Sequence, residues 1–120
     1  MVMVTKQQIL EEAQRYGSTL QALTHRPVPS ALDLRFWVFH RQNQKVYETL
    51  KRLAMTMWQK GRKQIGVGML WEVLRWEMYL ETSPDAEYKL NNSYRSRYAR
   101  LLMLQEPELA NLFETRELKS

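Results

Sequence analysis

Residues 69–81 read MLWEVLRWEMYLE, and apolar side chains occur on nearly the whole circumference of the helix that this segment predicts. A helix that is apolar on all sides is normally surrounded by other elements, so we expect it to be central to the fold. Glu72 and Arg75 are three residues apart and can pair on the one polar strip that is left. We expect Trp71 and Trp76 to pack in the core instead of stacking on bases.

Further helices are predicted on both sides of this segment. A helix over residues 43–60, with Asn43 as its cap and Gly61 as its end, is indicated by a continuous apolar face. That face consists of Val46, Leu50, Leu53 and Met57. Another helix begins at residues 91–93 and ends near Glu106. Pro107 is well placed as the first residue of a short last helix.

The prolines at 27 and 29 predict an extended connector, and it divides the chain into two parts. We expect an N-terminal helical arm at residues 1–29 and a core domain at residues 30–120. The arm either packs on the domain or is partly detached. Residues 32–39, LDLRFWVF, are a dense apolar segment that forms either a short helix or a strand and has to be buried.

The fold class that follows is mostly α, with a few short strands. Gly and Pro number only four each, which is too few for a turn-rich β-sandwich. Short extended pieces are expected near residues 64–66, 87–90 and 114–118. This order is compatible with a helix-turn-helix or winged-helix domain, although the link from Glu81 to Asn92 exceeds the usual turn of about 3–4 residues.

Several kinds of chemistry are not expected in this chain. Cysteine is absent, which rules out disulfides, thiolate catalysis and cysteine-based metal sites. His25 and His40 are the only histidines, and their spacing matches no metal motif. No paired carboxylates or nucleophile motif point to a reaction, so we predict a non-enzymatic protein without a cofactor or metal. No signal-peptide core or membrane span is visible, so we expect a soluble protein of the cytoplasm without a membrane partner.

The strongest functional signal is the stretch KLNNSYRSRYAR at residues 89–100, which holds four cations and no acid. Arg and Asn can read guanine and adenine edges, whereas Ser, Tyr and a helix N-terminus can hold phosphates. With a net charge of +5 and a pI near 9.6, this stretch predicts binding to duplex DNA. The predicted contacts are Lys89, Asn91, Asn92, Ser93, Arg95, Arg97 and Arg100, together with Arg62 and Lys63 just past the earlier helix.

Three segments of the second half carry a family resemblance: GVGMLWEVLRWE at residues 66–77, YKLNNSYRSRYARLL at 88–102 and EPELANLFETRE at 106–117. Over residues 36–118 the chain resembles a family of small phage and prophage proteins whose function is not established. The resemblance implies a viral or integrated-element origin and a bacterial host. It implies no particular activity.

Two alternatives to an isolated DNA-binding module remain open. The first is an interaction module that inhibits or redirects a host protein, because exposed Arg and Tyr residues are also favoured at protein interfaces. The basic stretch would then be a solvated helix face. The second concerns oligomeric state. Residues 36–39 would predict a homodimer if they were exposed, and DNA-binding modules of this size commonly dimerise across symmetric half-sites, so we favour a homodimer.

Overall fold

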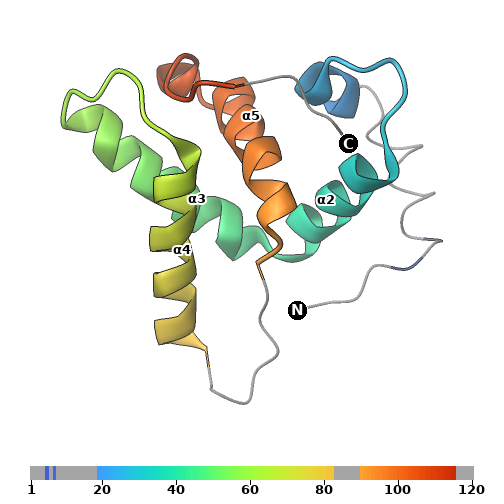
Figure 1. The fold of residues 1–120 in the computed structure, drawn as a ribbon, viewed down its shortest axis with the longest axis horizontal. Helices are drawn as coiled ribbons and strands as arrows, with labels where there is room; N and C mark the ends of the chain where they lie inside the picture. Colours follow the sequence, from blue (N-terminus) through green and yellow to red (C-terminus); the bar gives the residue numbers. More distant parts are fainter. Residues whose placement is uncertain (1–4, 6, 8–18, 83–89, 116–120) are drawn as a thin grey trace.

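Residues 5, 7, 19–82 and 90–115 are described by the computed structural model of the chain, and helices form most of them (Figure 1). This confirms the mostly α fold class. Residues 19–24 are helical. The elements that follow are α2 (Ala31–Gln42), α3 (Gln44–Gln59), α4 (Val67–Glu81), the 3-10 turn η1 (Asn92–Tyr94), α5 (Arg95–Gln105) and the 3-10 turn η2 (Pro107–Leu109).

Helix α2 begins at a reciprocal cap between Ser30 and Asp33. The Asp33 backbone N–H donates to Ser30 Oγ (3.1 Å), and the Ser30 backbone N–H donates to Asp33 Oδ2 (2.8 Å). This cap satisfies two backbone donors at the helix start. Of the two predicted options for residues 32–39, the structure has the helix. The helix buries residues 36–40, so the condition under which this segment predicted a homodimer is not met.

Helix α3 follows α2 after the single residue Asn43. Asn43 stands at the predicted cap position, but its side-chain amide donates to the Phe39 carbonyl (2.9 Å) and so closes α2 instead of capping α3. At the other end Gly61 has a φ of 86°, a left-handed conformation that favours glycine. The backbone N–H of Gly61 donates to the Trp58 carbonyl (3.0 Å), which ends the helix where the sequence predicted.

The core is formed by residues of α2, α3, α4 and α5, and Tyr98 of α5 lies within it. The Tyr98 ring contacts Phe36 edge to face at a centroid distance of 4.8 Å and lies 5.8 Å from Trp71. Leu20 and Leu23 of the N-terminal helical segment are also buried in this core. The part of the predicted arm that the structure describes therefore packs on the domain. The domain boundary at residue 29 stays a prediction, and most of residues 1–18 are not among the described residues.

Extended structure is limited to one contact within residues 19–82 and 90–115. Ile65 and Phe113 form an isolated parallel bridge, in which the Ile65 N–H donates to the Leu112 carbonyl (2.8 Å). The extended pieces expected at 87–90 and 114–118 fall largely outside the described residues. Because the link between α4 and α5 also falls there, the helix-turn-helix and winged-helix arrangements stay predictions.

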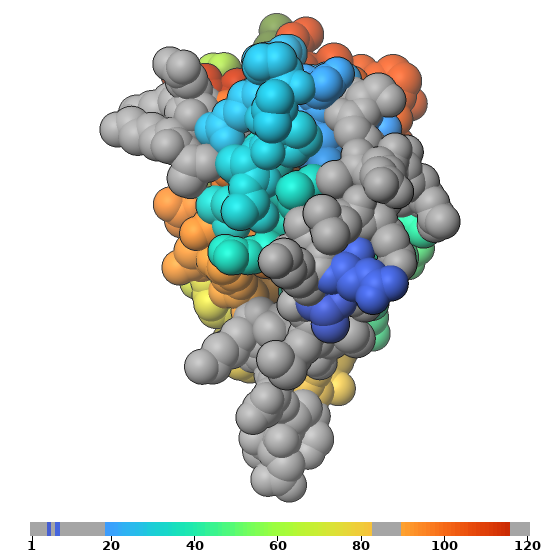
Figure 2. Space-filling model, turned by 90° about the vertical axis from the view of Figure 1, so that its right-hand side faces the viewer, coloured from blue at the N-terminus to red at the C-terminus, as the bar shows by residue number. Residues whose placement is uncertain are grey.

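Helix α4 does not occupy the central place that its composition predicted. It lies beside α5 and crosses α3 at one side of the molecule (Figure 1). Only one side of it is buried, through Leu70, Trp71, Leu74 and Met78. In Figure 2, which views the molecule from the side of α2, α4 shows only in small areas at the left margin and in the lower half. Among the described helices none has both the length and the apolarity needed to cross a bilayer.

Candidate interaction surfaces

The side of α4 that faces away from the core carries large apolar side chains in contact with solvent. They are Met69 (50% exposed), Val73 (40%), Trp76 (65%), Tyr79 (60%) and Leu80 (68%), and we refer to this set as the α4 apolar face. Four of them recur at i, i+4, i+7 and i+11, which places them along one line of the helix. The prediction that Trp76 packs in the core is therefore wrong, whereas Trp71 is fully buried as expected.

The opposite side of α4 is fixed in the fold by packing and by one amide. The Trp71 indole N–H donates to Asn92 Oδ1 (3.1 Å), and Arg75 donates to the same oxygen. Because Asn92 begins η1, these bonds tie α4 to the entry of α5. The orientation of α4 is therefore set by these bonds and by its buried side, and it does not depend on the exposed apolar side chains.

Acidic residues lie on both flanks of the α4 apolar face. Glu72 pairs with Arg75 of the same helix (3.3 Å), and Glu77 pairs with Arg52 of α3. Both carboxylates are therefore partly neutralised within the chain. Exposed ion pairs of this kind contribute little to stability, but they define polar edges for the apolar strip.

The start of α5 presents three of the predicted nucleic-acid contacts to solvent. Asn91, Ser93 and Arg95 are exposed, and Asn91 Oδ1 accepts the Ser93 backbone N–H (2.9 Å), as the predicted cap requires. Asn92 is exposed as a residue, but its side-chain oxygen accepts from Trp71 and Arg75. Lys89 lies outside the described residues.

Arg97 requires a correction, because it lies in the interior. The residue is 2% exposed, and its guanidinium Nε donates to Asp33 Oδ1 (2.8 Å) while Nη1 donates to the Ser93 carbonyl (3.1 Å). Asp33 is itself fully buried and also pairs with Arg26 (3.2 Å). In this fold Arg97 therefore joins α5 to α2 and does not reach a nucleic-acid phosphate or base.

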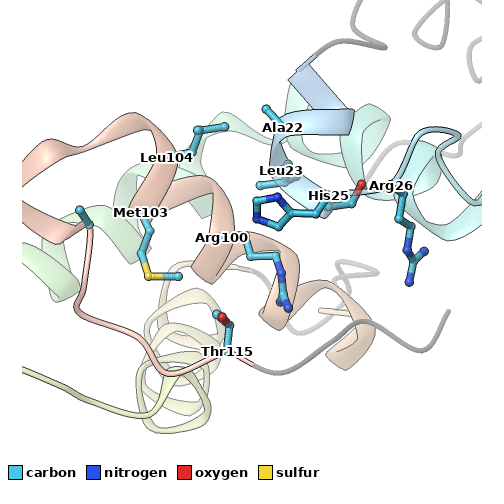
Figure 3. A pocket seen from close by; sticks show the side chains of 10 residues that line it. Ala22, Leu23, His25, Arg26, Arg100, Met103, Leu104 and Thr115 are labelled. Atoms are coloured by element: carbon cyan, nitrogen blue, oxygen red, sulfur yellow. The ribbon is translucent and has the colours of Figure 1, made fainter.

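Arg100 lies on a different side of α5 from Arg95. It lines a cleft of about 570 Å³ that also includes His25, Arg26 and Met103, here called the basic cleft. Figure 3 shows this cleft between the end of the N-terminal helix and α5, with the His25 ring above the Arg100 side chain. Burial lowers the pKa of Arg100 below the ordinary arginine value, and the nearby charges of Arg97 and Arg26 lower it further, while Asp33 opposes them.

The second basic group of the prediction lies near the C-terminal end of α5. Arg62 and Lys63 are exposed and line a shallow pocket of about 470 Å³ with Trp58, Pro107 and Glu108. Pro107 follows α5, whereas Asn91 and Ser93 precede it. The structure therefore distributes the predicted contacts over both ends of α5 and over the basic cleft, instead of gathering them on one face.

The described residues contain no group of three His, Asp or Glu side chains arranged to hold a metal ion. Comparison with protein-family models, with curated proteins and with solved structures gives no significant match. Of the surfaces above, sequence reasoning missed the α4 apolar face. The 4-3-4 spacing of Met69, Val73, Trp76 and Leu80 shows an apolar line along the helix, but Trp71, Leu74 and Met78 form a second line, so spacing alone does not identify the exposed one.

Proposed function

We propose that the protein is a non-enzymatic protein-interaction module whose binding surface is the α4 apolar face. The observation that carries this proposal is the exposure of five large apolar side chains on one side of one helix. Contiguous apolar patches on soluble proteins commonly mark binding surfaces, because covering them removes apolar area from water.

The composition of the face suits protein recognition. Trp and Tyr are enriched among the residues that dominate binding energy, and Met adapts to irregular partner surfaces. Trp76 and Tyr79 supply large and stiff contact areas, while Met69 provides an adaptable edge. The Glu72–Arg75 and Glu77–Arg52 pairs form the polar rim that such interfaces have.

The resemblance to phage and prophage proteins suggests the setting in which this module works. We place its activity in the cytoplasm of a bacterial host, where inhibition or redirection of a host protein is one use of such a surface. The net charge of +5 would speed association with an acidic partner without determining which partner is bound.

Site-specific photo-cross-linking in the cells that produce the protein tests this proposal. A photoreactive amino acid at position 76 should give a discrete covalent adduct, either with another protein or with a second copy. The matched control is position 28, because Val28 is also an exposed apolar residue (75%) but lies outside α4. An adduct from position 28 alone, or none from position 76 at wild-type expression, would contradict the proposal.

Binding to duplex DNA is a second candidate function, and the exposed polar residues near α5 favour it. Asn91, Ser93 and Arg95 lie at the entry of α5, and Arg62 and Lys63 add two exposed cations. Neither Arg62, Lys63 nor Arg95 forms an ion pair with an acid among residues 19–82 and 90–115. Nucleic acid attracts such cations through the release of its condensed counterions.

Fluorescence anisotropy with random duplex DNA, single-stranded DNA and RNA tests the second candidate. A titration between about 50 and 200 mM salt should show duplex affinity that falls steeply with salt. Folded protein that binds none of the three nucleic acids at the lowest salt would exclude it and leave the protein-interaction proposal intact.

A further inference from the structure

We propose that the α4 apolar face binds a second copy of this chain, with the two α4 helices packed side by side in antiparallel orientation. This inference rests on the proposed function, because it names the occupant of the same surface. Three features of α4 support it: the spacing of the exposed residues, the match of that spacing to itself when one copy is reversed, and the position of the acidic residues.

The spacing of the exposed residues is that of a helix-pairing seam. Met69, Val73, Trp76 and Leu80 alternate steps of four and three residues, which corresponds to successive d, a, d and a positions of a heptad repeat. Leu74 and Met78, on the other side of the helix, are buried in the protein's own core. The core and the seam therefore use opposite sides of α4, and pairing requires no rearrangement of the fold.

The seam is complementary to itself when the second helix is reversed. Antiparallel pairing about a two-fold axis near residue 75 places Val73 opposite Trp76 of the second copy and Met69 opposite its Leu80. Each layer then combines a larger and a smaller or more flexible side chain. On one flank Glu72 comes opposite Tyr79 of the second copy, and the tyrosine hydroxyl can donate to the carboxylate.

Parallel pairing of the same helices is disfavoured by charge and shape. It would bring Glu72 of each copy against Glu77 of the other, which places like charges together on both flanks. It would also force Trp76 against Trp76 in a single layer. Reversing one helix separates the Glu72 and Glu77 carboxylates onto opposite flanks, so the charge pattern selects the antiparallel arrangement.

The extent of the seam sets the expected strength. One helix side of about three turns buries less area than the roughly 800 Å² per partner of a standard stable interface. We therefore expect a reversible dimer whose population rises with concentration. Substitution of Trp76 by Gln removes the largest side chain of the seam and should raise the dissociation constant at least about tenfold in sedimentation velocity.

The absence of cysteine from the chain allows a direct test of orientation. We would prepare the full-length variants Met69→Cys and Leu80→Cys, and Val28→Cys as an exposed control outside the seam. Disulfides form only when the Cα atoms approach to about 4.4–6.8 Å, so oxidation under mild conditions reports which positions face each other. Circular dichroism of each variant verifies that it is folded.

The antiparallel arrangement predicts a specific pattern. A mixture of Met69→Cys and Leu80→Cys should give a covalent dimer joining one chain of each kind, while neither variant alone nor Val28→Cys should do so. Dimers from each single variant alone would establish parallel pairing and overturn the inference. Monomers in every case, with sedimentation also monomeric at high concentration, would exclude a second copy as the occupant. The photo-cross-link from position 76 would then decide separately whether the surface binds another protein.

Discussion

Asp33 and Arg97, 64 residues apart in the sequence, form an ion pair in the interior of the protein, with Nε and Oδ1 2.8 Å apart and side-chain exposures of 0% and 3%. The Asp33 carboxylate also accepts the backbone N–H of Ser30, the N-cap residue of α2, and the guanidinium of Arg26. One carboxylate thus links the N-terminal connector, the start of α2 and the middle of α5. Removing one partner of a buried ion pair leaves the other charge uncompensated, so such a substitution should destabilise the fold.

We expect Arg97→Ala to lower the free energy of unfolding by about 3–5 kcal/mol, because it leaves the Asp33 carboxylate buried with a missing partner. Urea denaturation followed by circular dichroism measures this loss. The matched control is Arg95→Ala on the same helix, whose exposed side chain should matter by no more than about 0.5 kcal/mol. Equal effects of the two variants would show that the Asp33–Arg97 pair is not the link described above.

Substitutions of the two tryptophans of α4 should affect different properties of the protein, namely stability for Trp71 and association for Trp76. Trp71→Ala should cost about 3–5 kcal/mol of stability, because the ring is fully buried against Tyr98. Trp76→Gln should change stability by less than about 0.5 kcal/mol and act instead on association. Thermal and urea unfolding of the two variants at low protein concentration separate these effects. A large loss from Trp76→Gln in the monomer would place Trp76 in the core after all.

The stability of the protein should fall in mildly acidic solution because of His40. Burial, with a smaller contribution from neighbouring Arg41, lowers the pKa of His40 from 6.5 to about 4. Between these two values the unfolded chain binds a proton that the folded chain does not, so stability decreases as pH falls from about 6.5 to 4. The full loss amounts to roughly 3 kcal/mol, and this group contributes no pH dependence above that range.

Unfolding free energies at pH 7 and pH 4.5 test this prediction. The variant His40→Leu places an apolar side chain of similar size among the surrounding rings and removes the titrating group. It should show a smaller loss between the two pH values than the wild-type protein does. An identical loss in both proteins would assign the acid sensitivity to other groups.

If the protein binds duplex DNA, its dependence on salt should identify the cations involved. The double variant Arg62→Ala, Lys63→Ala should reduce the slope of log affinity against log salt by about two units while leaving the fold unchanged. Arg95→Ala tests the other end of α5 in the same way. An unchanged slope in all variants would mean that these side chains do not contact phosphates. Arg97 is unsuitable for this test, because its substitution should impair folding.

The helices were predictable from the sequence because their limits are set locally. Gly61 supplies the positive φ that ends α3, and Pro107 begins η2 as predicted. The choice of helix for α2 also had a local signal, since Ser30 followed by Asp33 matches the pattern of a reciprocal cap. The consecutive apolar residues 36–39 show no helical spacing, and for this reason the sequence left helix and strand open for this segment.

The exposed side of α4 was not predictable from periodicity alone. A helix with apolar residues all round gives no indication of which side meets the core, and that choice is made here by contacts with α3 and α5. Arg97 was misplaced for a related reason. Its charge suggested solvent, yet it lies between Tyr94 and Leu101 on the buried side of α5, and its partner Asp33 is distant in sequence.

The most direct test of the account is hydroxyl-radical footprinting of the two α4 tryptophans, read by mass spectrometry, in dilute purified protein and in the cells that produce it. We predict that Trp71 is protected in both conditions, whereas Trp76 is oxidised in the dilute protein and protected in the cell, where the α4 apolar face is bound. Equal oxidation of Trp76 in both conditions would contradict the claim that this face is an interaction surface.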